Sequence, residues 1–244
     1  YLVRNSRSQD EDGSTQHTRR NIAASLAYMI VFTLTVWLAS VDWVMSLEPE
    51  WTSTIFGIYH LSGLFVAGVA AIILLVLWLK RSAPLRDFVN DEHLHDLGKL
   101  LFAFSTFWMY IFFSQYMLIW YANITEESVY YILRQQGVLG LLFIANVVLN
   151  WGVPFLILLS ITAKRTPAIL ASMAVLILIG RWLDLYLMIL PPVTHGKVAL
   201  PWVEIGMMLG ATGLFGLSFL AWFRRAPQTP VRDPMLAQSL AYHN

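Results

Sequence analysis

Six long apolar blocks alternate with short polar segments along the chain. The blocks cover approximately residues 22–45, 53–79, 98–122, 135–162, 167–190 and 202–223. A helix needs about 20 apolar residues to cross the hydrocarbon core of a bilayer, and each block reaches that length. The pattern therefore predicts an all-α, polytopic bundle of six transmembrane helices over 22–223. A polar segment at 1–21, of which 1–18 is interpreted as a loop, precedes the bundle, and a polar tail at 224–244 follows it.

Basic residues lie at alternate ends of these blocks. They precede the first block and follow the second, fourth and sixth: Arg19, Arg20, Lys80, Arg81, Arg86, Lys164, Arg165, Arg224 and Arg225. The other loops carry Glu48, Glu50, Glu126 and Glu127, and only Arg134 and Lys197 depart from the alternation. Because cytoplasmic loops of membrane proteins are enriched in Lys and Arg, both ends of the chain and the 80–97 loop are expected to be cytoplasmic.

Composition supports the membrane interpretation and excludes several functional classes. Hydrophobic residues make up 57% of the chain and charged residues 13%, whereas about a quarter of the residues in a soluble domain are charged. The absence of cysteine excludes disulfides, thiolate metal sites, iron–sulfur clusters and covalently attached c-type haem from this chain. No nucleotide-binding loop, catalytic triad or nucleic-acid patch is present, so no catalytic residue is assigned and no nucleic-acid partner is expected.

Seven polar residues inside or beside the spans are the candidates for a proton path. With the orientation above, all of them fall in one layer toward the outer surface: Asp42, His60, Gln115, Tyr116, Arg181, Asp184 and Glu204. Ionisable groups at membrane depth are costly and often functional. Arg181 and Asp184 are three residues apart, so they share a helix face and can pair. The pair could hold helices together, or it could serve a proton path or a quinone headgroup.

The histidines do not indicate a cofactor. His60 is the only histidine clearly within a span, so a b-type haem held by two facing histidines is disfavoured. His93 and His95 form an H-x-H motif beside Asp96, but nothing else completes a metal site, and capping of the following helix explains them better. Neither a metal nor a bound cofactor is therefore predicted for this chain.

Two features concern packing. Pro154 lies inside the fourth block and is expected to kink it, freeing carbonyls that Asn146, Asn150 or a neighbouring helix could satisfy. The last block carries a row of glycines that predicts close packing against another helix. These glycines are Gly206, Gly210, Gly213 and Gly216.

Two long segments resemble a known family. HDLGKLLFAFSTFWMYIFFSQYMLIWYANITEE, around Gln115, and VDWVMSLEPEWTSTIFGIYHLSG, around Asp42 and His60, resemble the F-subunit family (ActF) of bacterial alternative complex III, as does the C-terminal RDPMLAQSL. This complex is a quinol:cytochrome c oxidoreductase, and the family is similar to NrfD-like polysulfide-reductase membrane subunits. Members are expected to have about ten spans, so the resemblance implies the C-terminal part of a longer subunit.

The resemblance also implies partners and a location. It implies a cofactor-free subunit in a bacterial inner membrane, assembled with a paralogous membrane subunit and with subunits that carry iron–sulfur clusters and haem c. Quinone contact is possible, and the implied roles are support of quinol oxidation, proton translocation and structural support. The alternatives are a purely structural scaffold and, less favoured, a secondary transporter, for which paired broken helices would be typical.

Overall fold

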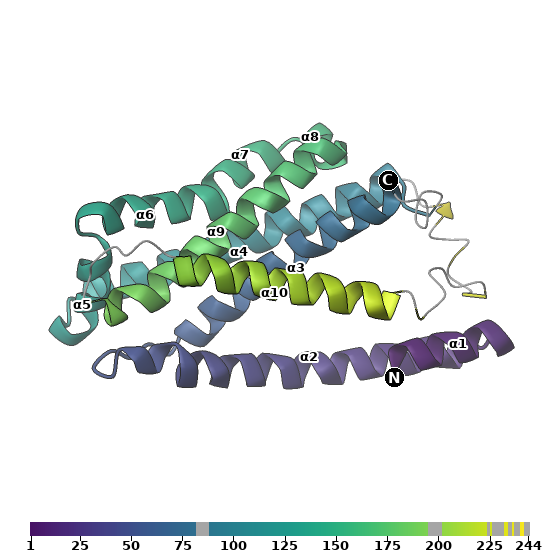
Figure 1. Cartoon of the computed structure of the whole chain (residues 1–244), viewed down its shortest axis with the longest axis horizontal. Coiled ribbons are helices and arrows are strands. Elements are labelled where there is room, and N and C mark those ends of the chain that lie inside the picture. Colours follow the sequence, from purple (N-terminus) through teal and green to yellow (C-terminus); the bar gives the residue numbers. More distant parts are fainter. Residues whose placement is uncertain are drawn as a thin grey trace.

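The computed structural model describes most of the chain. The described residues are 1–81, 88–194, 202–223, 225, 232–233, 236 and 240–241. The basic flanks at Arg86, Lys197 and Arg224, and most of the predicted tail 224–244, lie outside them. Every regular segment among the described residues is helical (Figure 1).

Twelve helical segments follow one another along the described chain. They are α1 (Leu2–Asp12), α2 (Thr15–Trp43), the 3₁₀ turn η1 (Met45–Leu47), α3 (Phe56–Arg81), α4 (Asp91–Ala122), α5 (Thr125–Arg134), α6 (Gly137–Val147), the π-helical turn η2 (Val148–Gly152), α7 (Val153–Leu158), α8 (Ile161–Arg165), α9 (Pro167–Val193) and α10 (Trp202–Phe223). The end of the bundle that carries the 44–55 loop and α5 is called here the Glu48 end, and the opposite end the Arg165 end.

The prediction of six membrane-length helices is confirmed. Within the described residues, α2 with η1, α3, α4, the continuous α6–η2–α7 segment, α9 and α10 are each long and apolar enough to cross a bilayer. Successive spans run in opposite directions between the Glu48 end and the Arg165 end (Figure 1). The chain is thus an all-helical, multi-pass membrane protein.

The expectation of a loop over residues 1–18 is wrong. Residues Leu2–Asp12 form α1, which ends at Gly13 in the left-handed conformation (φ 69°) and turns directly into α2. Ser14 caps α2 by accepting a hydrogen bond from the Gln16 N–H, and Gln9 donates to Thr18 across the turn at 2.8 Å. A polar helix has no apolar stripe to reveal it in the sequence, whereas glycine in the left-handed region is a common helix end.

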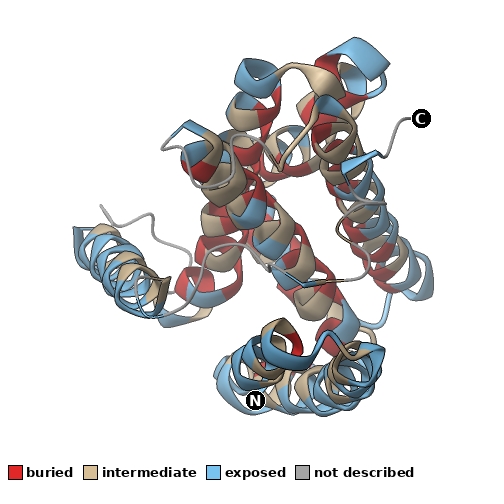
Figure 2. Cartoon of the chain, turned by 90° about the vertical axis from the view of Figure 1, so that its right-hand side faces the viewer, coloured by how far each residue is buried: buried red, intermediate tan, exposed pale blue. Residues whose placement is uncertain are grey.

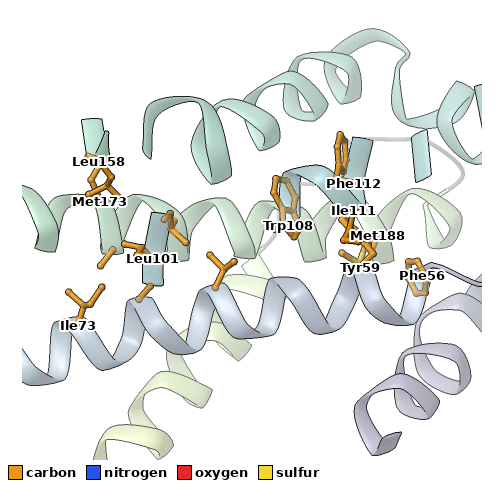
Figure 3. Close-up of a cluster of buried hydrophobic side chains, with 14 of the residues drawn as sticks. Phe56, Tyr59, Ile73, Leu101, Trp108, Ile111, Phe112, Leu158, Met173 and Met188 are labelled. Atoms are coloured by element: carbon orange, nitrogen blue, oxygen red, sulfur yellow. The ribbon is translucent and has the colours of Figure 1, made fainter. Parts of the chain in front are cut away.

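The core is built from three central helices, α3, α4 and α9, whose buried residues recur at alternating intervals of three and four. In α4 the stripe comprises Leu94, Gly98, Leu101, Ser105, Trp108, Phe112, Gln115 and Ile119. In α9 it comprises Leu170, Met173, Ile177, Gly180, Asp184, Leu187 and Pro191. This 3.5-residue repeat keeps one face of each helix in contact with its neighbours along its whole length. Figure 3 shows part of the resulting cluster, from Phe56 and Tyr59 to Leu158 and Met173.

The kink predicted at Pro154 takes the form of a π-helical turn. Residues Val148–Gly152 form this turn immediately before the proline. The Asn150 side chain donates to the Asn146 carbonyl at 2.9 Å, one turn before the residues whose carbonyls the proline deprives of an N–H. A π turn widens the helix locally and directs side chains that a regular helix would place elsewhere.

His93 takes part in the cap at the start of α4. Asn90 accepts from the His93 N–H at 3.0 Å, and the Asn90 N–H donates to His93 Nδ1 at 3.2 Å. Glu92 in the same turn accepts from Arg165 of α8 at 2.7 Å. Within the part of the chain that the structure describes, no group of three His, Asp or Glu side chains could hold a metal ion.

Two spans lie at the periphery. The membrane-length windows of α2 and α10 contain no buried residue, whereas more than half of the α9 window is buried, and red buried positions concentrate on the facing sides of the central helices (Figure 2). None of the four glycines of α10 has a described atom within 4 Å of where a Cβ would stand. The close packing predicted for this glycine row therefore does not occur among the described residues.

Candidate functional site

A buried carboxylate, Asp184, lies at the centre of the most polar region of the bundle. It comes from the core stripe of α9 and is 1% exposed. Arg181, one turn earlier on the same helix, places Nη1 2.7 Å from Asp184 Oδ2. The hydroxyl of Tyr59 and the amide of Asn146, the latter at 2.6 Å, both donate to Oδ1. Three helices, α3, α6 and α9, thus converge on one carboxyl group.

An outer set of residues holds these partners in place. Asn150 donates to Asn146 Oδ1 at 2.7 Å, which leaves the Asn146 amide free to donate to Asp184. The Arg181 guanidinium also lies over the Trp108 ring, 5.4 Å from its centre. Together Tyr59, Asn146, Asn150, Arg181 and Asp184 are called here the Asp184 network. Because a buried polar group is costly unless it is paired and hydrogen-bonded, the contacts of this network offset the cost of burying the Asp184 carboxyl group.

The Arg181 guanidinium occupies space that only a glycine leaves open. A Cβ at Gly63 of α3 would stand 1.9 Å from Arg181 Nη2 and 2.2 Å from Cζ. The backbone of α3 therefore forms one wall of the guanidinium site, and a methyl group there has to displace the cation.

Gly63→Ala is expected to expel the guanidinium and to destabilise the protein by about 3 kcal/mol, the scale for a buried ion pair that loses one partner. The thermal unfolding midpoint in detergent measures the effect. Gly68→Ala is the matched control, since no described atom lies within 4 Å of a Cβ at that position. Equal midpoints for the two variants would contradict this interpretation of Gly63.

A second buried cation, Arg134, lies closer to the Glu48 end. It is 2% exposed, it ends α5, and its guanidinium stacks on the Tyr130 ring at 3.5 Å. It donates to the carbonyls of Leu187 at 2.7 Å and Met188 at 3.1 Å in α9. It also donates to the Tyr130 carbonyl at 2.8 Å and pairs with Glu48 at 2.5 Å. These hydrogen bonds connect α5 and the 44–55 loop to the end of α9.

A small cavity lies between Arg134 and the Asp184 network. Its volume is about 20 Å³, and both Asp184 and Arg134 line it, together with Tyr59, Tyr131 and Asn146. A space of about 10–15 Å³ suffices for one water, provided polar groups are there to bind it. The carboxylate, the amide and the phenol hydroxyls meet that condition, so the cavity can hold one water between the Asp184 network and the Glu48–Arg134 pair.

Tyr130 lines this cavity and also a second groove that Glu48 borders. It lies in α5, outside the membrane-spanning helices, and stacks on Trp51 with ring centres 4.0 Å apart. Burial raises the pKa of the Tyr130 phenol to about 12. Burial also raises the pKa of the neighbouring Tyr131 well above its usual value.

The pKa of Tyr130 predicts an alkaline transition. Because its folded-state pKa lies above the unfolded value of about 10, its contribution to stability is complete below pH 10 and is lost as pH rises toward 12. Unfolding midpoints measured from pH 8 to 12 are expected to fall less steeply in Tyr130→Phe than in the parent chain. Tyr121→Phe, at an exposed position, serves as control; a parent-like slope in Tyr130→Phe would contradict the assignment.

Few buried polar residues of the spans lie between the network and the Arg165 end. Between Asn150 and the Arg165 end, the described core positions are apolar: Ile73, Leu94, Leu101, Leu158, Leu170, Met173, Ala174 and Ile177. Ser105 is the one buried polar residue close to this layer among the described residues, and it bonds the Phe102 carbonyl of its own helix. The small cavity and Arg134 thus lie on the other side of the network, toward the Glu48 end.

The structure brings together three of the seven residues selected from the sequence. Arg181 and Asp184 pair as expected, and His60 lies close enough for both charges to act on it, with its Nδ1 buried and without a described hydrogen-bond partner. Gln115 and Tyr116 lie apart from them: Gln115 borders a separate groove, and Tyr116 packs edge-on against Tyr131.

The two remaining candidates do not belong to the network. Asp42 is exposed, and Glu204 is partly buried near Tyr186 of α9. Sequence reasoning missed Tyr59 and the role of Arg134. The sequence did mark Arg134 as unusual, because it is a basic residue in a loop region that otherwise carries glutamates. The structure explains this position, since Arg134 is a buried partner of Glu48.

Comparisons with known proteins do not identify the chain. No protein-family model matches it, and no curated protein matches it significantly.

Proposed function

We propose that the chain is an integral membrane subunit of a quinol:electron-acceptor oxidoreductase complex, in which the Asp184 network forms a proton half-channel. The sequence resemblance to the F-subunit family of alternative complex III supports the respiratory role. On that reading the protein lies in a bacterial inner membrane with both ends of this chain cytoplasmic. Subunits with haem c and iron–sulfur clusters and a paralogous membrane subunit are its partners.

The observation that carries the half-channel is the placement of Asp184. Its carboxylate is buried in the core, yet it borders a cavity with room for one water, and Arg134, the partner of Glu48, lines the same cavity. Apart from its ion pair, Asp184 Oδ2 has no hydrogen-bond partner among the described residues, so it can accept one from that water. A proton can then pass between Asp184 and Glu48 through the water and the phenol hydroxyls. With the orientation that the basic residues favour, this route opens to the outer surface.

The test is proton-coupled turnover of the assembled complex. Asp184→Asn keeps the shape of the side chain and removes its charge, and it is expected to lower proton release per electron at least about tenfold while the complex still assembles. His60→Phe tests the neighbouring histidine in the same assay. Glu126→Gln, at an exposed position in α5, is the control. Unchanged turnover and proton release in both network variants would refute the half-channel.

A structural scaffold is the second candidate, and the contacts of Arg134 favour it. Its bonds to Leu187, Met188 and Glu48 join α5 to α9 and to the 44–55 loop. If the Asp184 network serves the same purpose, Asp184→Asn will reduce the yield and thermal stability of the complex without changing turnover per intact complex. Isolation of the chain without haem-bearing partners would instead favour an independent transporter.

A further inference from the structure

A groove at the Glu48 end, separate from the Asp184 network, contains a buried amide with no assigned partner. The groove measures about 420 Å³ and lies between α2, the 52–55 segment and α4. Gln115 of α4 borders it and is 2% exposed. No hydrogen bond joins its carboxamide to another described residue, and its polar atoms are not enclosed by protein but border the groove. A molecule that occupies the groove can therefore form hydrogen bonds with this amide.

The described lining of the groove combines apolar and polar side chains. Trp37 of α2 and Leu118 of α4 contribute to the walls, and Thr52, Ser53 and Thr54 contribute hydroxyls. Gln115 lies seven residues before the end of α4, which at 1.5 Å per residue is about 10 Å of helix. The groove thus extends from the membrane surface to the depth at which lipid headgroups meet their acyl chains.

The charged residue in the lining of the groove favours some amphipathic ligands over others. Glu127 of α5 is the charged side chain of the described lining, and no Lys or Arg borders the groove. An anionic headgroup alone is therefore disfavoured. A headgroup with a primary ammonium can pair with Glu127, while its phosphate can accept hydrogen bonds from the threonine and serine hydroxyls and the Gln115 amide.

The position of Trp37 is fixed by a close helix approach. A Cβ at Gly57 of α3 would stand 1.4 Å from Trp37 Cδ1, so the indole lies directly on the α3 backbone. The groove wall is therefore set by helix packing and does not depend on a flexible loop. An indole at this depth is typical of membrane interfaces, where its apolar ring and N–H suit the headgroup region.

We propose that this groove binds the headgroup of a zwitterionic phospholipid that carries a primary ammonium, as ethanolamine does. The ammonium lies against Glu127, the phosphate lies near Thr52–Thr54 and Gln115, and the acyl chains follow the α2 and α4 walls into the bilayer. This site does not depend on the proton half-channel or on the respiratory assignment.

Native mass spectrometry of the delipidated full chain, titrated with single lipids, tests the proposal. Dioleoylphosphatidylethanolamine is expected to bind about tenfold more tightly than the phosphatidylglycerol or phosphatidylcholine analogues, the latter lacking N–H donors. Gln115→Leu should weaken ethanolamine-lipid binding about tenfold. Glu127→Gln should abolish the preference over phosphatidylglycerol.

Matched variants separate the groove from general effects. Gln136→Leu and Glu126→Gln change exposed residues of the same types outside the groove and should bind as the parent does. Lipid-free unfolding midpoints verify that each variant is folded. Equal affinity for the three lipids, or parent-like binding by both groove variants, would overturn the proposal. So would competitive displacement of the ethanolamine lipid by decylubiquinone, because the groove would then be a quinone site.

Discussion

Asp184→Leu is expected to lower the free energy of unfolding by about 3–5 kcal/mol, the range for removal of one partner from a buried ion pair. Arg181 is 5% exposed and would keep its charge, with only the Trp108 ring beside it. The amide of Asn146 and the hydroxyl of Tyr59 would lose their common acceptor as well. Reversible unfolding in mixed micelles, followed by circular dichroism, measures this loss.

The double variant Asp184→Leu/Arg181→Met separates an unpaired charge from lost packing. With both charges removed, the unfolding free energy should return to within about 1–2 kcal/mol of the parent value, since apolar replacements of buried pairs are often nearly neutral. The single variant Arg181→Met should resemble Asp184→Leu. If the double variant is as unstable as the sum of the two single ones, the pair does not act as a unit and this account of the network fails.

The spans were predictable because apolar length is a direct consequence of bilayer thickness. For α10 the expected bounds, 202–223, coincide with the helix that forms. Two helices begin well before their apolar blocks because polar residues at membrane surfaces continue a helix without disturbing the apolar count: α2 begins at Thr15, and α4 begins at Asp91, capped by Asn90. For the same reason α1, which is polar throughout, left no trace in the hydropathy pattern. The fourth span, Gly137–Leu158, is instead shorter than the block 135–162.

Which face of each span is buried was harder to predict. In a membrane the outside of a bundle is as apolar as its core, so hydrophobicity does not mark the inner face. The buried stripes instead carry the small residues, such as Gly63 and Ala70 in α3 and Gly180 in α9. Small residues therefore mark the buried faces of α3 and α9, whereas the glycines of α10 pack against no described residue.

The candidate site was predicted in part. The spacing of Arg181 and Asp184 fixed their pairing, because residues three apart share a helix face. Tyr59 was not predicted, because its contact with Asp184 spans 125 positions of sequence and depends on how α3 and α9 pack. Gln115 was grouped with the network on depth alone, and depth does not specify direction around the helix axis.

Arg134→Met is expected to have the second large effect, a loss of about 3–5 kcal/mol in unfolding free energy. The methionine fills similar space, but it leaves the carbonyls of Leu187 and Met188 without their side-chain donor and Glu48 without its cation. The loss should be local as well as global. Because Arg134 joins α5 to α9, amide hydrogen exchange over residues 125–134 should accelerate in Arg134→Met before exchange in α3 or α4 changes.

Glu48→Gln provides the comparison that assigns the effect to the backbone contacts. Glu48 is more exposed than Arg134, with 17% of its side chain accessible against 2%, so water can replace part of its interaction and its removal should cost clearly less. Arg134→Lys keeps the charge, but a lysine cannot reach the four acceptors that one planar guanidinium reaches. Its loss of unfolding free energy should therefore lie between those of Glu48→Gln and Arg134→Met. If Glu48→Gln proves as damaging as Arg134→Met, the ion pair and not the attachment to α9 is the reason for a buried cation at this end of the bundle.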